Sequence, residues 1–201
     1  MTKQIGFIGL GHMGMPMALG LLKAGYIVQG YDMNPELVHQ FQHHGGHIAS
    51  SLIALAQTNE VLLTMLPSAS ALLDIYSPEA TFIQTLNPGT LVIDCSTVGP
   101  IASLTWHQIA KEHTLKSVDA PVSGGVMAAS LGSLSFMLGG QEDAVLQAED
   151  ILKSIGKKLI RTGGAGSGQA AKICNNLVLA NNMVAVSEAF LLAKHLNLAP
   201  D

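Results

Sequence analysis

A glycine-rich turn near the start of the chain constrains the fold more than any other feature of the sequence. Residues 4–8 form a short apolar run, and residues 9–14 follow with the pattern Gly-x-Gly-x-x-Gly before a helical pattern begins. Such a turn can place an anion at a helix N-terminus, where free N–H groups and the helix dipole favour negative charge. In this pattern Gly9 permits the tight turn, Gly11 lets a pyrophosphate approach the backbone, and Gly14 lets the helix pack on the strand.

A carboxylate at the end of the next strand-like run strengthens this interpretation. Residues 27–31 are followed by Asp32, roughly 20 residues after the turn, where a carboxylate can accept hydrogen bonds from both hydroxyls of an adenine ribose. Met33, Asn34 and Pro35 come next, so no Arg or Lys is placed to neutralise a 2′-phosphate. The pattern predicts a dinucleotide site that prefers NAD to NADP. The alternative is a structural turn, with Asp32 as a helix cap.

Short β-rich runs alternate with helical patterns along most of the chain. Strands are expected at residues 4–8, 27–31, 61–65, 90–94, 116–119, 133–138 and 158–161. Helices are expected at residues 15–23, 35–43, 69–76, 101–111 and 142–154. This alternation indicates a mainly parallel sheet covered by helices on both faces, so the predicted fold class is α/β, with a Rossmann-like doubly wound sheet.

The character of the sequence changes after Arg161. Residues 163–168 are rich in glycine, and no helix breaker follows them until Pro200. At about 1.5 Å per residue, a helix of this length exceeds most helices inside a compact domain. We therefore expect a Rossmann-like NAD-binding domain over residues 1–162 and, over residues 163–201, the first long helix of a truncated all-α C-terminal domain.

The composition narrows the class of protein. Of the 201 residues, 48% are apolar and 12% are charged, which excludes intrinsic disorder and favours protein interfaces on the surface. The chain has 10 Lys and Arg, 14 Asp and Glu, and no basic run. It therefore lacks the basic patch that binding to nucleic acid or anionic lipid requires. Two uncharged segments, 4–22 and 120–141, contain too many interruptions for a signal peptide or a membrane span. We expect neither nucleic acid nor a membrane as a partner.

Cysteine and histidine give no indication of a disulfide framework or a metal centre. Cys95 and Cys174 lie far apart and form no CxxC pair, which suits a reducing compartment and a soluble cytoplasmic protein. His39 and His43 are spaced i, i+4, but no Cys or Glu completes a recognised ligand set. The sequence therefore predicts no metal site.

Further motifs accompany the glycine turn. They are Thr64-Met65-Leu66-Pro67, Asp94-Cys95-Ser96-Thr97, Asp119-Ala120-Pro121-Val122-Ser123-Gly124-Gly125, and Gly166-Ser167-Gly168-Gln169-Ala170-Ala171-Lys172-Ile173-Cys174-Asn175-Asn176. With these motifs in this order, the chain resembles the β-hydroxyacid dehydrogenase family from residue 4 to residue 201. The resemblance implies NAD-dependent oxidation of a 3-hydroxy acid, with 3-hydroxyisobutyrate favoured as substrate and methylmalonate semialdehyde as product.

The resemblance also implies roles for individual residues. Lys172 would handle the proton, Asn176 would bind the substrate, and Ser123, Gly124 and Gly125, within the motif at 119–125, would hold the substrate carboxylate. His12 would face solvent or phosphate, without a catalytic role. The expected cofactor contacts are Gly9, Leu10, Gly11, His12, Met13, Gly14, Asp32, Met65, Leu66, Pro67 and Thr97.

The residue types suit these roles. Taking a hydride from an alcohol carbon needs a base for the hydroxyl proton, which contributes about 10² to 10⁴ in rate. In an apolar site the pKa of Lys172 is expected to fall, because desolvation disfavours the charged form; a solvated helix face is the alternative. Lys172, Asn175 and Asn176 form a polar stripe at i, i+3 and i+4 on an otherwise apolar segment.

Two small-residue segments are candidates for ligand contact. Successive N–H groups at residues 123–125 can turn toward one carboxylate as an anion nest, or they can form a plain turn. Ser96 and Thr97 follow a predicted strand, at the edge where α/β sheets bind ligands. They can also cap the helix that follows Pro100.

The resemblance leaves several functions open. Members of the family continue into an all-helical domain, of which this sequence holds the first helix, so a catalytically silent NAD-binding module is an alternative to an enzyme. Another alternative is a reductase of tartronate, glyoxylate or succinic semialdehyde. Because the terminal helix must hide its apolar face, we also expect a homo-oligomer.

Overall fold

The computed structural model of the chain describes residues 4–199, so the first three and last two residues of the predicted domains lie outside the described residues. The strands are β1 (Gln4–Ile8), β2 (Ile27–Tyr31), β3 (His47–Ile48), β4 (Val61–Thr64), β5 (Leu91–Asp94), β6 (Lys116–Asp119), β7 (Val122–Ser123), β8 (Leu134–Gly140) and β9 (Gly156–Gly163). The helices are α1 (Gly14–Lys23), α2 (Pro35–His43), α3 (Leu52–Thr58), α4 (Ala69–Ile75), α5 (Thr81–Thr85), α6 (Pro100–Glu112), α7 (Gly125–Ser130), α8 (Glu142–Leu152) and α9 (Ser167–His195).

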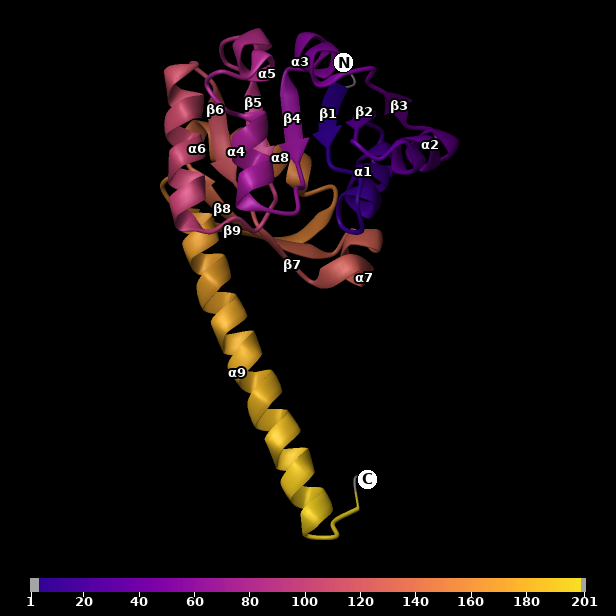
Figure 1. Ribbon diagram of the computed structural model, residues 1–201, viewed down its shortest axis with the longest axis vertical. Coiled ribbons are helices and arrows are strands. Elements are labelled where there is room, and N and C mark those ends of the chain that lie inside the picture. Colours follow the sequence, from indigo (N-terminus) through magenta and orange to yellow (C-terminus); the bar gives the residue numbers. More distant parts are fainter. Residues whose placement is uncertain (1–3, 200–201) are drawn as a thin grey trace.

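The strands form one mainly parallel sheet (Figure 1). Its parallel part has the order β3-β2-β1-β4-β5-β6. Beyond β6, β8 pairs with it in the antiparallel sense, and β7 and β9 pair with β8. The chain runs outward from β1 to β3 and then returns to β4, which makes the boundary between β1 and β4 the switch point where doubly wound folds bind ligands. The predicted Rossmann-like fold is confirmed.

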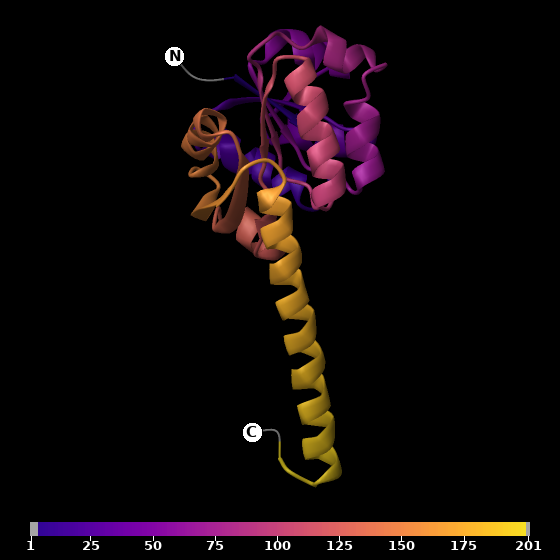
Figure 2. The ribbon, with the colours of Figure 1, turned by 90° about the vertical axis from the view of Figure 1, so that its left-hand side faces the viewer.

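Helices cover both faces of the sheet (Figure 2) because the strands are apolar on both sides. Ile5 and Phe7 of β1 belong to the core beneath α1 and α8, whereas Ile8 belongs to the core beneath α3, α4 and α6. The central strands β4 and β5 are buried at every position. Such strands buried on both faces are typical of parallel sheets.

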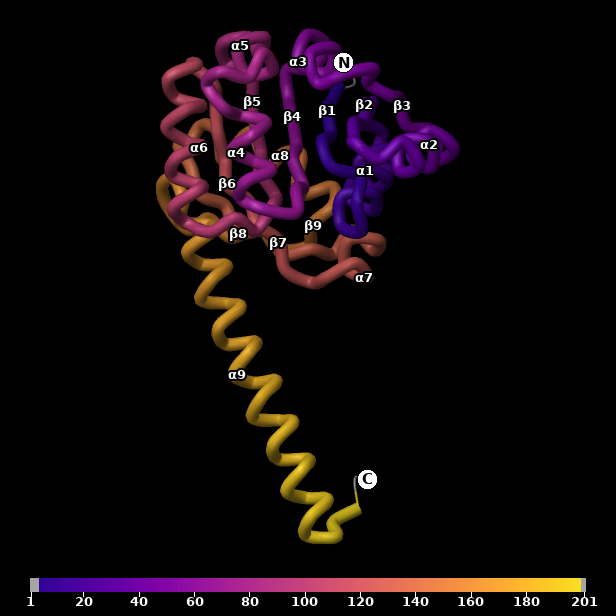
Figure 3. The backbone as a smooth tube through the Cα atoms, in the orientation of Figure 1, coloured from indigo at the N-terminus to yellow at the C-terminus, as the bar shows by residue number. Residues whose placement is uncertain are grey.

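The last helix, α9, leaves this domain as a single rod (Figures 1 and 3). It contains 29 residues, of which Gly168 and Gln169 alone are buried, so the long helix predicted from the sequence is confirmed. Within residues 4–199, α9 is also the one helix whose length and composition would allow it to cross a membrane.

Some elements differ from the sequence-based prediction. The structure adds β3, β7, α3, α5 and α7, for which no strand or helix was predicted. β9 extends beyond the predicted residues 158–161, and α8 ends at Leu152, before the predicted residue 154. The boundary predicted after residue 162 falls one residue before the end of β9, and the division into two domains stays a prediction.

Candidate active site

The turn after β1 has a backbone that requires glycine at two positions. Gly9 has a φ of +95°, and a Cβ there would lie 2.3 Å from the carbonyl oxygen of Met65. A Cβ on Gly14 would lie 1.8 Å from the carbonyl oxygen of Gly9. By contrast, a Cβ on Gly11 would meet no atom within 4 Å. The space at Gly11 is therefore open to a ligand, as a phosphate-binding turn requires.

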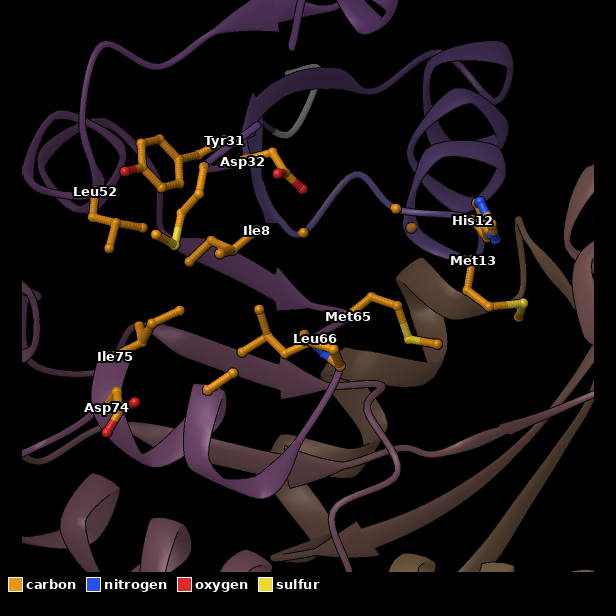
Figure 4. A pocket seen from close by; sticks show the side chains of 16 residues that line it. Ile8, His12, Met13, Tyr31, Asp32, Leu52, Met65, Leu66, Asp74 and Ile75 are labelled. Carbon is orange, nitrogen blue, oxygen red and sulfur yellow. The ribbon is translucent and has the colours of Figure 1, made fainter. Parts of the chain in front are cut away.

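A cleft of about 740 Å³ opens beside this turn (Figure 4), a size within the range of cofactor sites. Nine of the predicted cofactor contacts line it: Gly9, Gly11, His12, Met13, Gly14, Asp32, Met65, Leu66 and Pro67. Its remaining lining residues were not expected from the sequence: Ile8, Tyr31, Met33, Leu52, Ala71, Asp74 and Ile75.

The cleft lies at the carboxyl ends of β1, β2 and β4, where backbone hydrogen bonds hold three loops together. The N–H of Gly9 donates to the carbonyl of Tyr31, and the N–H of Met65 donates to that of Ile8, both at 2.9 Å. Met13 is the N-cap of α1 and makes no side-chain capping hydrogen bond. In the first turn of α1 the N–H of Met15 donates to the carbonyl of Gly11 and Pro16 has no N–H, which leaves the N–H of Gly14 for an anion.

Asp32 is held in place by two backbone groups. Its Oδ2 accepts a hydrogen bond from the N–H of Leu10 at 2.7 Å, and its Oδ1 accepts one from the N–H of Asn34 at 2.8 Å. The cap of α2 is Asn34, whose Oδ1 accepts from the N–H of Glu36, so the alternative of Asp32 as the helix cap is wrong. Each carboxylate oxygen keeps a lone pair with which to accept a ligand hydroxyl.

Two other predicted cofactor contacts, Leu10 and Thr97, do not line the cleft. The side chain of Leu10 is fully buried in the core beneath α1, so its contribution to the turn is its backbone. Thr97 is exposed in the loop after β5. Their contact with a cofactor stays a prediction.

The histidines of α2 lie at the helix end that the sequence indicates. The Nδ1 of His44, at the C-cap, lies 2.7 Å from the carbonyl oxygen of Gln40, and Gly45 follows with a φ of +88°. Across residues 4–199 there is no group of three or more His, Cys, Asp or Glu placed to hold a metal ion.

A buried polar network connects the wall of the cleft to the loop after β5. Asp94 Oδ1 accepts hydrogen bonds from the hydroxyls of Thr64 at 2.7 Å and Ser96 at 2.6 Å, and Ser96 Oγ accepts from the N–H of Leu66 at 2.8 Å. Burial raises the pKa of Asp94 above its ordinary value, and the Ser96 and Thr64 hydrogen bonds oppose this rise. Helix α6 is preceded by Gly99 without a side-chain cap, so the expected capping role of Ser96 or Thr97 is wrong.

The carboxylate of Asp119 accepts hydrogen bonds from the start of α9. Its Oδ1 accepts a hydrogen bond from the N–H of Gly166 and its Oδ2 accepts one from the N–H of Gln169, both at 2.9 Å. The Nε2 of His107 also lies 2.9 Å from Oδ1. Asp119 is fully buried, so within the motif at 119–125 it holds the helix, and its oxygens do not face a ligand. No pattern in the sequence indicates this role.

Lys172 lies one helical turn beyond Gln169 and is half-buried. Burial lowers the pKa of Lys172 below its ordinary value of 10.5, because the charged form loses hydration. A lysine that accepts protons near neutral pH requires a shift in this direction. In the polar stripe beyond it, Asn175 is half-buried and Asn176 is exposed, and the Asn175 amide donates to Asn176 Oδ1 at 3.4 Å.

The segment predicted to bind a carboxylate lies at the end of β7. Ser123 is half-buried, whereas Gly124 and Gly125 are exposed and have φ values of +129° and +69°. These conformations favour glycine, and they allow successive N–H groups to face a ligand. Helix α7, which follows, contacts α1, and both lie at the edge of the domain from which α9 emerges (Figure 1). Lys172, Asn176 and residues 123–125 do not line the cleft, so their contact with a ligand stays a prediction.

Two family models match the chain. One, described as the NAD binding domain of 6-phosphogluconate dehydrogenase, matches residues 4–164. The other, described as the NAD-binding of NADP-dependent 3-hydroxyisobutyrate dehydrogenase, matches residues 166–201. Together they cover α9 and the part of the chain from β1 to β9 (Gln4–Gly163), which we call the sheet domain.

Curated relatives are similar over nearly the whole chain. The probable mitochondrial 3-hydroxyisobutyrate dehydrogenase of Dictyostelium discoideum is 41% identical over 188 residues, which cover 94% of this chain and 59% of the relative. The NAD-dependent L-serine dehydrogenase of Pseudomonas aeruginosa is 40% identical over 190 residues, which cover 94% of this chain and 64% of the relative. The chain therefore spans about three fifths of the length of these relatives.

A solved structure is also similar. The Mycobacterium tuberculosis 3-hydroxyisobutyrate dehydrogenase with L-serine has a TM-score of 0.94 at 38% identity, and the match covers 100% of this chain and 68% of that chain. Because the match includes α9, that enzyme has a helix in the corresponding position. The resemblance drawn from the motifs is confirmed: the chain carries an NAD-binding domain and belongs to the β-hydroxyacid dehydrogenase family, together with the 3-hydroxyisobutyrate dehydrogenases.

Proposed function

We propose that the protein is an NAD-dependent dehydrogenase that oxidises the C3 hydroxyl of a small 3-hydroxy acid to an aldehyde. The observation that carries this proposal is the half-buried Lys172, whose pKa is lowered by burial. It lies near the start of a helix that is anchored to the loop after β5, and that loop is hydrogen-bonded to the wall of the cleft. A proton acceptor is thus available on the same edge of the sheet as a dinucleotide site.

The residues of the cleft fit NAD. The open side of Gly11 and the N-terminus of α1 would hold the pyrophosphate, and Asp32 would accept the hydroxyls of the adenine ribose. A carboxylate at this position would repel a 2′-phosphate, and Met33, Asn34 and Pro35 supply no cation. We therefore propose NAD in preference to NADP. When bound, NAD supplies the hydride acceptor.

The residues of this chain would supply the acid–base and binding groups. The neutral amine of Lys172 would accept the hydroxyl proton as the hydride leaves C3, so that the C–O single bond becomes a carbonyl. The backbone at Gly124 and Gly125 would bind the carboxylate, and the amide of Asn176 would contact the substrate. Loss of the Lys172 amine should therefore lower kcat, whereas loss of either binding group should raise the KM for the acid.

The proposed substrate is 3-hydroxyisobutyrate, which would give methylmalonate semialdehyde. L-Serine is a second candidate, because one relative is named an L-serine dehydrogenase and the M. tuberculosis structure holds L-serine. Both acids present a carboxylate and a C3 hydroxyl, so the same groups could orient either. Because the chain spans about three fifths of its relatives' length, an NAD-binding module without turnover is the competing proposal.

Two measurements separate these proposals. The 201-residue chain is mixed with NAD and either acid, the absorbance of reduced cofactor is followed, and NAD affinity is measured by calorimetry. Turnover supports the dehydrogenase, and the ratio of kcat/KM between the acids assigns the substrate. Binding of NAD without turnover favours the silent module. A chain that binds no NAD contradicts both.

We further infer that α9 is covered by protein and not by lipid. Although it is long and apolar enough to cross a membrane, it carries Lys172, Asn175 and Asn176, and such polar groups are costly inside a bilayer. The match to the M. tuberculosis enzyme over the whole chain also supports a place within a protein fold. We propose a homo-oligomer as the form in which α9 is buried. Light scattering without detergent tests this, and a monodisperse monomer contradicts it.

A further inference from the structure

The side chain of Gln169 makes hydrogen bonds that the family comparison does not indicate and that the proposed reaction does not use. It is fully buried in the first turn of α9. Its Oε1 accepts hydrogen bonds from the N–H groups of Val98 and Gly99, both at 3.1 Å, and its Nε2 donates to the carbonyl of Ser96 at 2.8 Å. One amide thus satisfies three backbone groups of a single loop, the one that joins β5 to α6.

The backbone around Gln169 is held just as closely. Its N–H donates to Asp119 Oδ2 at 2.9 Å. A Cβ on Gly168 would lie 2.4 Å from the carbonyl oxygen of Met137, so the helix approaches β8 as nearly as a glycine permits. The first turn of α9 therefore has one position relative to β6, β8 and the loop after β5. The rest of the helix contains no buried residue.

Hydrogen bonds lead from this turn to the cleft. Ser96, whose carbonyl accepts from Gln169, also accepts from the N–H of Leu66 through its hydroxyl, and Leu66 lines the cleft. Lys172 is three residues beyond Gln169, on the adjoining turn of the same helix. The side chain of Gln169 therefore links the start of the helix that carries Lys172 to a loop that is hydrogen-bonded to the wall of the cleft.

We propose that Gln169 is a positioning residue, which sets the place of Lys172 relative to the bound cofactor by holding the first turn of α9 on the loop after β5. This inference rests on the proposed function, in which Lys172 takes the hydroxyl proton. A proton acceptor must lie within hydrogen-bond reach of its substrate, and a displacement of about 1 Å can lower the rate about 100-fold. Gln169 itself is fully buried and does not line the cleft.

The test replaces the amide with a side chain of similar length. In Gln169→Met all three contacts with the loop are lost, so kcat is expected to fall about 100-fold while the KM for NAD changes less than about threefold. Gln169→Glu keeps acceptors for Val98 and Gly99 and should lose less, so it replaces the first variant if that one does not fold. In a Lys172→Ala background, Gln169→Met should cause no further loss of kcat, because it acts through that lysine.

Asn59 provides a matched control. It is a buried amide that donates to Leu55 and Gln29 near the amino end of β4, at the opposite edge of the sheet from the cleft. Asn59→Leu should lower stability while leaving kcat unchanged. If Asn59→Leu lowers kcat as much as Gln169→Met, or if the Gln169 variants keep full kcat, the positioning role is overturned.

A second measurement needs no turnover. The titration of Lys172 is followed by NMR on the ¹³C-methylated chain, with Lys172→Arg to assign the signal. The midpoint should lie below 10.5 in the native chain and rise toward 10.5 in Gln169→Met, because the released turn exposes the amine. An unchanged midpoint overturns the positioning role even if the chain is active. Absence of NAD turnover in the native chain overturns the proposed enzyme, and the titration still decides the role of Gln169.

Discussion

The sheet domain and α9 use apolar residues in opposite ways. In the sheet domain they are buried, and β4 and β5 are buried at every position. In α9 they are exposed: Leu177 is 63% and Phe190 is 60% accessible. Both regions are apolar in sequence, so apolarity alone does not say where a segment is buried within this chain. A helix that is apolar on all sides is usually covered by other protein.

Because of this difference, the proposed site lies where the two regions meet, at the first turn of α9. The sheet domain supplies a rigid cleft whose loops are tied to one another by backbone hydrogen bonds. Helix α9 supplies Lys172, yet it is held by its first turn alone, through Asp119 and Gln169. Cofactor binding should therefore depend on the sheet domain, whereas proton transfer should depend on the contact between that domain and the first turn of α9.

Removing the amine of Lys172 should have the largest effect. Lys172→Ala is expected to lower kcat by about 10² to 10⁴, because the hydroxyl proton then has no acceptor. NAD affinity should stay the same, because the cleft is formed by the sheet domain. Steady-state kinetics and calorimetry on the same preparation check both parts. An Ala variant that turns over at the native rate would show that the proton leaves by another route.

The pH dependence should follow the same amine. A base acts when it is deprotonated, and burial lowers the pKa of Lys172, so kcat/KM should rise with pH to a plateau whose midpoint lies below 10.5. Below that midpoint the rate should fall about tenfold per pH unit. Lys172→Arg keeps the charge but holds its proton, and it should be inactive across the range. A flat profile for the native chain would exclude lysine as the base.

Two glycine substitutions should separate the fold of the sheet domain from its ligand binding. Gly14→Ala places a Cβ against the backbone of Gly9 and should cost about 3 kcal/mol of unfolding free energy. Gly11→Ala meets no atom and should change stability by less than about 0.5 kcal/mol. It should nevertheless weaken NAD binding about tenfold, because the pyrophosphate loses a backbone contact. Urea unfolding and calorimetry measure the two quantities.

If Gly11→Ala binds NAD as tightly as the native chain, the open side of the turn is not where the phosphates lie. If Gly14→Ala is as stable as the native chain, the turn must shift to separate the new Cβ from the carbonyl oxygen of Gly9. The cleft would then not be rigid.

Asp32 should set the choice between the two nicotinamide cofactors. Asp32→Asn removes the charge while keeping the size, and the preference for NAD over NADP should fall about tenfold. The remaining amide oxygen can still accept from one of the two backbone N–H groups that hold Asp32. Affinities for both cofactors are measured by calorimetry. Equal affinities in the native chain would contradict the role given to this carboxylate.

The elements that the sequence predicted well are those whose signals are local. The strand β1 and the helix α2 have the expected bounds, because an apolar run marks the strand and a helical hydrophobic period marks the helix. The helix α7 and the strand β7, with 6 and 2 residues, are too short for a period to be recognised. The strand β7 pairs with β8, and α7 contacts β8, so both depend on a neighbour that their own residues do not indicate.

The same distinction holds for the candidate site. The glycine turn and Asp32 were predicted because a short pattern defines them. Leu10 belongs to that pattern, yet its side chain is in the core, since a motif does not say which way each residue points. Asp74 and Leu52 line the cleft because α3 and α4 pack beside β4, which no local pattern indicates. Asp119 looked like part of a ligand-binding motif, whereas its partners lie in α9.

The smallest effect on folding should come from the exposed part of α9. Phe190→Ser removes a ring that is 60% accessible, so the unfolding free energy of the sheet domain should change by less than about 0.5 kcal/mol. The matched control is Phe136→Ala in β8, where the lost ring is fully buried and the cost should be about 3 to 5 kcal/mol. Phe190→Ser should instead weaken self-association, seen as a smaller mass by light scattering. If it destabilises the sheet domain as Phe136→Ala does, α9 contributes to folding along its whole length, and the contrast between the two regions is lost.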